Sequence, residues 1–168
     1  MAIVIFDENF LMIQRIQTLY LIIGSFSMFL SFVFPFAVFK GMNGLDHILS
    51  ALSFIREDNE SYQLLNHIPY MILASFGGGV LLANVLFYKN LNLQRKIGRL
   101  LYVLLLASIG AMFWMIFSNM KSLNNLHLQM DFYHVGFYLP FVALIMNFMA
   151  NRGIRRDQNL LKSLDRLR

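Results

Sequence analysis

Residues 100–120 read LLYVLLLASIGAMFWMIFSNM and contain no Asp, Glu, Lys or Arg. A helix needs about 20 consecutive apolar residues to cross a hydrocarbon layer of about 30 Å, and this stretch meets that requirement. Its apolar residues do not alternate with polar ones at the period of two that membrane β-barrel strands show. The stretch therefore predicts a membrane-spanning helix, because a helix satisfies its own backbone hydrogen bonds in lipid.

Three further stretches share this length and composition, and none of them carries a charged side chain: residues 16–39, 68–88 and 132–150. We expect an all-α fold, a four-transmembrane-helix bundle that forms a single integral membrane domain over residues 1–168. The composition agrees, because charged residues make up 14% of the chain and about 25% of a typical soluble domain. The chain has no Cys, which excludes disulfides, thiolate metal sites and cysteine nucleophiles.

The basic residues gather on one side of this arrangement. Eleven of the fourteen lie before the first span, in the connection 89–99 or in the tail: Arg15, Lys89, Arg95, Lys96, Arg99, Arg152, Arg155, Arg156, Lys162, Arg166 and Arg168. The outer loop 40–67 and the connection 121–131 hold only Lys40, Arg56 and Lys121. Because Lys and Arg are retained in the cytoplasm, we expect a multi-pass inner-membrane protein with both termini cytoplasmic. The pI near 9.7 then reflects topology, and no nucleic-acid partner is expected.

The basic tail, residues 151–168, reads NRGIRRDQNLLKSLDRLR. Gly153 is expected to end the fourth helix, and Asp157 to cap a second, short amphipathic helix. That helix would lie on the inner leaflet, or its leucine stripe would dock onto a partner or the 89–99 connection. The candidate membrane-surface or partner contacts are Arg152, Arg155, Arg156, Leu160, Leu161, Lys162, Leu164, Arg166, Leu167 and Arg168.

The outer loop contains the segment LDHILSALSFI at residues 45–55. Its apolar residues recur at helical spacing, so we expect a short helix on the outer face. This helix would cap the bundle or meet a partner. Within the spans, Gly77, Gly78 and Gly79 are expected to let another helix approach closely, and Asn84 and Asn147 to form interhelical hydrogen bonds. Two prolines inside the spans, Pro35 and Pro140, are expected to kink their helices.

A search for chemistry finds no nucleophile–base pair, no paired carboxylates and no metal motif in the sequence. His67 and His134 could in principle bind a metal or a haem, but they lack the spacing of a ligand motif. We interpret the four histidines (His47, His67, His127 and His134) as interfacial side chains. We therefore predict no enzyme activity, no cofactor and no metal site.

Two terminal stretches, MIQRIQTLYL at residues 12–21 and ANRGIRRDQNLLKSLDRLR at residues 150–168, resemble a bacterial membrane family classed as domain of unknown function 4293. The resemblance implies four spans, a basic C-terminus and no assigned activity. Residues 1–11 depart from the pattern, so Met12 is the family-like start.

The spans hold no ionisable residue besides His134, which disfavours transport. We expect an interaction or accessory subunit of a larger membrane complex, with membrane lipids and a membrane-protein partner or a second copy as its contacts. The alternative is a bundle that binds or carries an apolar ligand, a lipid or a quinone, between kinked helices.

Overall fold

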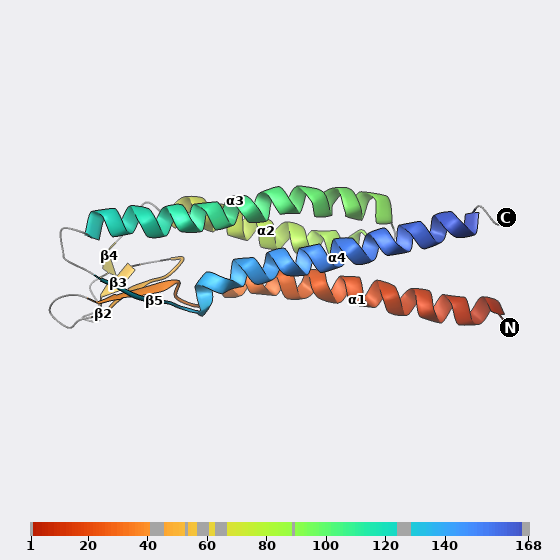
Figure 1. Cartoon of the computed structure of the whole chain (residues 1–168), viewed down its shortest axis with the longest axis horizontal. Helices are drawn as coiled ribbons and strands as arrows, with labels where there is room; N and C mark the ends of the chain where they lie inside the picture. The colour runs from red at the N-terminus through yellow and green to blue at the C-terminus, as the bar shows by residue number, and fades with distance from the viewer. Residues whose placement is uncertain are drawn as a thin grey trace.

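The computed structural model describes residues 2–40, 46–52, 54–56, 61–62, 67–88, 90–123 and 129–165 (Figure 1). Four long helices lie side by side: α1 (Ala2–Leu30), α2 (Ile68–Leu86), α3 (Leu91–Leu123) and α4 (Val135–Asp165). Successive helices run in opposite directions, and α1 and α3 each pack against both α2 and α4. The predicted four-helix bundle is confirmed.

Within the described residues, three helices are long and apolar enough to cross a membrane, and their apolar segments are Ile68–Leu86, Leu91–Asn119 and Val135–Leu160. The apolar segment of α1, Ile16–Leu30, is shorter. The outside of the bundle is apolar: Leu100, Trp114 and Phe76 expose 70%, 68% and 63% of their surface. Water would disfavour so many exposed rings and aliphatic chains, so these faces are suited to lipid.

A small antiparallel sheet lies at one end of the bundle and adds a β element to the predicted all-α fold (Figure 1). Its strands are β1 (Ala37–Lys40), β2 (Asp46–Leu49), β3 (Phe54–Arg56), β4 (Ser61–Tyr62) and β5 (Gln129–Tyr133), in the order β4-β3-β2-β1-β5. Val38 pairs with Ile48 on one side and Phe132 on the other. We call this the sheet end. The opposite end holds both termini and the α2–α3 connection, and we call it the basic end.

The predicted first span, residues 16–39, is wrong in its second half. Helix α1 ends at Leu30, turns follow, and Ala37 begins β1. Pro35 explains this ending, because proline lacks a backbone donor and disfavours helical geometry at the preceding residue. Pro35 therefore lies outside the helices, whereas Pro140 lies inside α4. The fourth span also begins later than expected, at Val135, because residues 129–133 form β5.

The predicted helix at residues 45–55 is also wrong, because the described residues of this segment form β2, a connection at residues 50–52 and the start of β3. Ile48 pairs with Ile55, and Leu49 pairs with Phe54. A short isolated helix is marginal in water, whereas β-branched and aromatic residues gain from cross-strand pairing. The same apolar positions serve either structure, so their spacing alone could not distinguish the two.

Tyr70 links the sheet end to the bundle. Its side chain is fully buried, and its hydroxyl lies 2.6 Å from the Ser31 hydroxyl at the end of α1. The Phe36 ring meets the Tyr70 ring edge-on at 5.1 Å. The backbone N–H of His134 donates to the Phe36 carbonyl at 2.9 Å, so α1, α2 and the start of α4 are joined at one point.

Candidate functional site at the basic end

Helix α4 continues without a break through the basic tail to Asp165. The predictions that Gly153 ends this helix and that Asp157 caps a second one are therefore wrong. Gly153 is a packing residue: a Cβ at this position would lie 2.8 Å from Cγ of Gln17 on α1. The absence of a side chain lets α1 and α4 approach, and the helix needs no left-handed residue there.

Two buried polar contacts hold the extension of α4 against its neighbours. On the α1 side, Gln17 donates a hydrogen bond through Nε2 to Oδ2 of Asp157, and both side chains are buried. On the α3 side, Gln158 donates through Nε2 to the Leu91 carbonyl at 2.9 Å and accepts from Arg95 at 2.8 Å. The extension is thus part of the bundle, because buried polar groups are costly unless these partners stay in place.

Helices α3 and α4 approach closely at Gly98. Asn147 donates through Nδ2 to the Gly98 carbonyl at 3.1 Å, which confirms the interhelical hydrogen bond expected of it. The Asn151 carboxamide lies over Gly98, where any Cβ would overlap it. Asn151 in turn donates to the Asn147 carbonyl at 3.0 Å. Gly98 therefore makes room for the carboxamide of Asn151 between the two helices.

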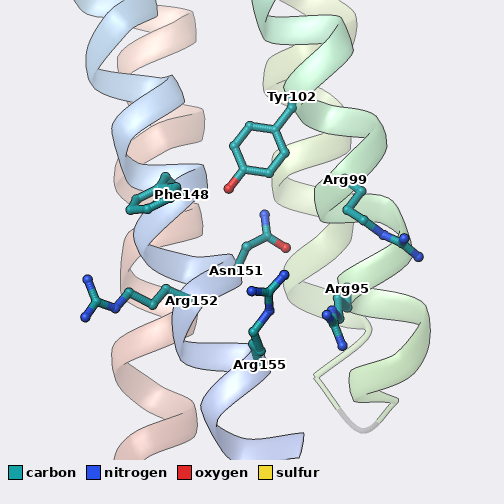
Figure 2. Close-up of a pocket in the computed structure, with 7 residues that line it drawn as sticks. All are labelled: Arg95, Arg99, Tyr102, Phe148, Asn151, Arg152 and Arg155. Carbon is teal, nitrogen blue, oxygen red and sulfur yellow. The ribbon is translucent and has the colours of Figure 1, made fainter.

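A pocket of about 420 Å³ opens between α3 and α4 beside this contact. It is lined by four arginines, two aromatic rings and one amide: Arg95, Arg99, Arg152, Arg155, Tyr102, Phe148 and Asn151. Figure 2 shows a gradient along it, with the rings of Tyr102 and Phe148 toward the middle of the bundle and Arg95 and Arg155 nearer its end. The hydroxyl of Tyr102 points toward Asn151 (Figure 2).

Among the described residues, the lining of the pocket includes no Asp or Glu, so none of them compensates its positive charge. Asp157, the acidic residue closest in sequence, is turned toward Gln17 of α1. Within the part of the chain that the structure describes, Arg99, Arg152 and Arg155 form no hydrogen bond or ion pair with another residue. All three are exposed, so their guanidinium groups are available to a ligand.

Residues 13–167 match the family described as Domain of unknown function (DUF4293). The chain belongs to this family. The resemblance drawn from the two terminal stretches is confirmed, and the match includes α1 from residue 13, the α2–α3 connection and the tail to residue 167. No curated protein matches the chain.

The DUF4293 structure divides the tail residues predicted as contacts into three groups. Arg152 and Arg155 line the pocket, whereas Arg156 and Leu160 are exposed outside its lining. The side chains of Leu161, Lys162 and Leu164, and all of Arg166, Leu167 and Arg168, lie outside the described residues. The expected leucine stripe therefore stays a prediction.

The α3 half of this pocket was not predicted from the sequence, because Arg95 and Arg99 were interpreted only as indicators of membrane topology. The available signal was their spacing. Arg95, Arg99 and Tyr102 follow one another at i, i+4 and i+7, which places them on one helical face. Phe148, Asn151 and Arg155 have i, i+3 and i+7 spacing on α4. The sequence therefore showed that each set of residues lies on one face of its helix. It did not show that these two helices are neighbours.

Two of the three glycines of α2 pack inside the DUF4293 bundle. Cβ atoms at Gly77 and Gly78 would lie 3.6 Å and 3.3 Å from side-chain atoms of Met28 on α1. Ser25 donates to the Gly78 carbonyl at 2.8 Å, whereas Gly79 faces open space. In the described residues, no group of three or more His, Asp or Glu could hold a metal ion.

Proposed function

We propose that this DUF4293 protein is an interaction or accessory subunit of a larger membrane complex in the bacterial inner membrane. In this proposal both termini are cytoplasmic, and the basic end is the contact surface for the partner. The single observation that carries the proposal is the basic extension of α4, which is held in a fixed position by α1 and α3.

A fixed extension suits recognition because the helix backbone that carries its charged side chains is already ordered. Binding then costs less conformational entropy than ordering a free tail would. Lys96 and Arg156 are exposed on α3 and α4 and would attract an acidic surface. Such charges raise the rate of association with the partner and set the orientation in which it binds, more than they increase its affinity. These effects suit a subunit that assembles in the membrane plane.

The orientation is supported by the distribution of charge. Six described basic residues belong to the basic end: Arg95, Lys96, Arg99, Arg152, Arg155 and Arg156. Lys40, Arg56 and Lys121 belong to the sheet end. The positive-inside rule directs the basic end to the cytoplasm. The sheet would then lie on the outer side of the membrane.

The test is cross-linking in cells that make the protein naturally. A photoreactive amino acid replaces the exposed Asn159 at the basic end or, as the matched control, the exposed Leu52 at the sheet end. We expect one protein to be recovered in stoichiometric amounts through Asn159, and to be lost when Lys96→Glu and Arg156→Glu are combined. Cross-linking of two copies would identify a homo-oligomer. A protein that elutes alone and monodisperse after cross-linking of intact membranes would overturn the proposal.

A second candidate function is the binding of an apolar ligand, a lipid or a quinone. One observation favours it: the described residues that line a groove of about 600 Å³ between α2 and α3 are all apolar, among them Phe76, Val80, Ile97 and Leu104. Mass spectrometry of the gently purified protein would decide. A bound quinone or lipid that is lost in Val80→Trp would favour this candidate over the subunit.

A further inference from the structure

We infer that the arginine-lined pocket between α3 and α4 is a binding site for a phosphate group, supplied by an anionic membrane lipid. The inference is independent of the accessory role proposed above. The pocket could bind a phosphate in a protein that acts alone, and a partner could bind the basic end with the pocket empty.

The positive charge of the pocket is the first observation that supports an anion site. Four arginines line a single space, and no acidic residue is among the described residues of its lining. Cations held together repel one another, and an anion between them relieves that repulsion. Arginine is suited to phosphate because its planar guanidinium group can donate two parallel hydrogen bonds to phosphate oxygens. A divalent or doubly phosphorylated headgroup would match this charge better than a single carboxylate.

The second observation is that lining residues of the pocket are held in place by hydrogen bonds within the protein. Arg95 is held by its 2.8 Å hydrogen bond to Gln158, and Gln158 is itself fixed to the start of α3. Asn151 is fixed above Gly98 by its bond to Asn147. One lining residue on α3, Arg95, and one on α4, Asn151, are therefore held in place without a ligand. This distinguishes the pocket from a cluster of mobile surface cations.

The polarity gradient indicates where the phosphate comes from. The rings of Tyr102 and Phe148 line the side of the pocket toward the middle of the bundle, and the guanidinium groups of Arg95 and Arg155 lie on the side toward its end (Figure 2). Phe148 exposes 51% of its surface. An anionic lipid has the same order of groups, with acyl chains beneath a glycerol phosphate. Basic pockets between transmembrane helices on the cytoplasmic side bind such headgroups.

The basic end also offers the control that separates a built site from general surface charge. Lys96 and Arg156 are exposed on the same two helices, one residue away from Arg95 and Arg155, and neither lines the pocket. The pocket variant is Arg99→Gln with Arg155→Gln, and the matched control is Lys96→Gln with Arg156→Gln. Each pair removes two positive charges from the same end of the bundle.

The experiment measures binding of defined probes to the purified, delipidated full-length protein. Native mass spectrometry counts bound cardiolipin, phosphatidylglycerol or phosphatidylcholine, and thermal unfolding in neutral detergent reports stabilisation by each lipid. A second arm titrates inorganic pyrophosphate. We expect wild type to bind cardiolipin or phosphatidylglycerol and not phosphatidylcholine. Because a charged hydrogen bond contributes substantially, we expect affinity to fall about tenfold for each arginine removed in the pocket variant. The control variant should bind within about twofold of wild type.

The arms separate the two sources of phosphate. Lipid binding that only the pocket variant loses supports the site and assigns it to a membrane lipid. Pyrophosphate binding that only the pocket variant loses, with no lipid bound, supports the phosphate site and assigns it to a soluble ligand. Equal losses in the pocket and control variants, or no binding of any probe to wild type, would overturn the inference. Arg99→Lys with Arg155→Lys keeps the charge and should bind with intermediate affinity.

Discussion

Replacing Gln17 with Leu should loosen the α4 extension from α1. The Gln17 side chain is 3% exposed and is the hydrogen-bond donor to Asp157, which is 1% exposed. Leucine keeps much of the side-chain volume beside Gly153 but leaves a buried carboxylate without its donor. Burying an unsatisfied charged group costs about 3 kcal/mol. For a chain of this length, that corresponds to a fall of roughly 6–12 °C in the midpoint of thermal unfolding.

The assay is a double-mutant cycle, read by thermal unfolding of the purified protein in one neutral detergent. Asp157→Leu should also destabilise, because it leaves the Gln17 amide buried without its acceptor. The double variant replaces both partners with apolar groups, which is far less costly than removing one. We therefore expect a coupling of at least about 1 kcal/mol between the two positions. Asn159→Leu, at an exposed position of α4, should change stability by less than about 0.5 kcal/mol. Additive losses in the cycle would refute the contact and the fixed extension with it.

Three further predictions concern helix packing and use the same unfolding assay. A Cβ at Gly136 would overlap the backbone carbonyls of residues 34 and 35, so Gly136→Ala should cost about 1–3 kcal/mol. Gly79 faces open space in mid-helix, so Gly79→Ala should be neutral or stabilise by up to about 1 kcal/mol. A larger loss of stability for Gly79→Ala than for Gly136→Ala would contradict the packing. Tyr70→Phe should cost about 1–2 kcal/mol, because it leaves the buried Ser31 hydroxyl without the Tyr70 hydroxyl; a smaller loss when Ser31→Ala is added would support the pair.

The apolar runs predicted the helices well where nothing interrupted them. The second span was expected at residues 68–88, and α2 covers Ile68–Leu86. Its start is favoured by Pro69 in the first turn, where the missing backbone donor has no cost. The third span lies within α3, which begins earlier, at Leu91. Asn90 precedes this helix, and its side-chain oxygen accepts a hydrogen bond from the backbone N–H of Leu93. Apolar composition predicts what lies in lipid, but helices also extend beyond it.

Predictions from the sequence were wrong where the same residues are compatible with two different structures. Gly153 is a common helix terminator, but here it is a contact surface for Gln17, and that role depends on a partner 136 positions earlier in the chain. The sheet end was not predicted for the same reason, because β1 pairs with β5, and strands β2 to β4 and helices α2 and α3 lie between them in the chain. Long-range partners of this kind leave no periodic signal.

Half of the pocket could be predicted. The tail was recognised as a cationic contact surface, and Arg152 and Arg155 do line the site. Its other half required knowing that α3 and α4 are neighbours and that Gly98 brings them together. A bundle whose helices are apolar on their outer faces does not reveal its helix order through hydrophobic pattern, because lipid and core select the same side chains.

The central claim is that the basic end, with its arginine pocket, faces the cytoplasm and the sheet end faces outward. The chain has no native cysteine, so single cysteines can be introduced at the exposed Asn159 and Leu52 and labelled in intact spheroplasts with a membrane-impermeant maleimide. We expect Leu52→Cys to react at once and Asn159→Cys to react only after the membrane is opened. Labelling of Asn159→Cys in sealed spheroplasts, with Leu52→Cys protected, would contradict the account.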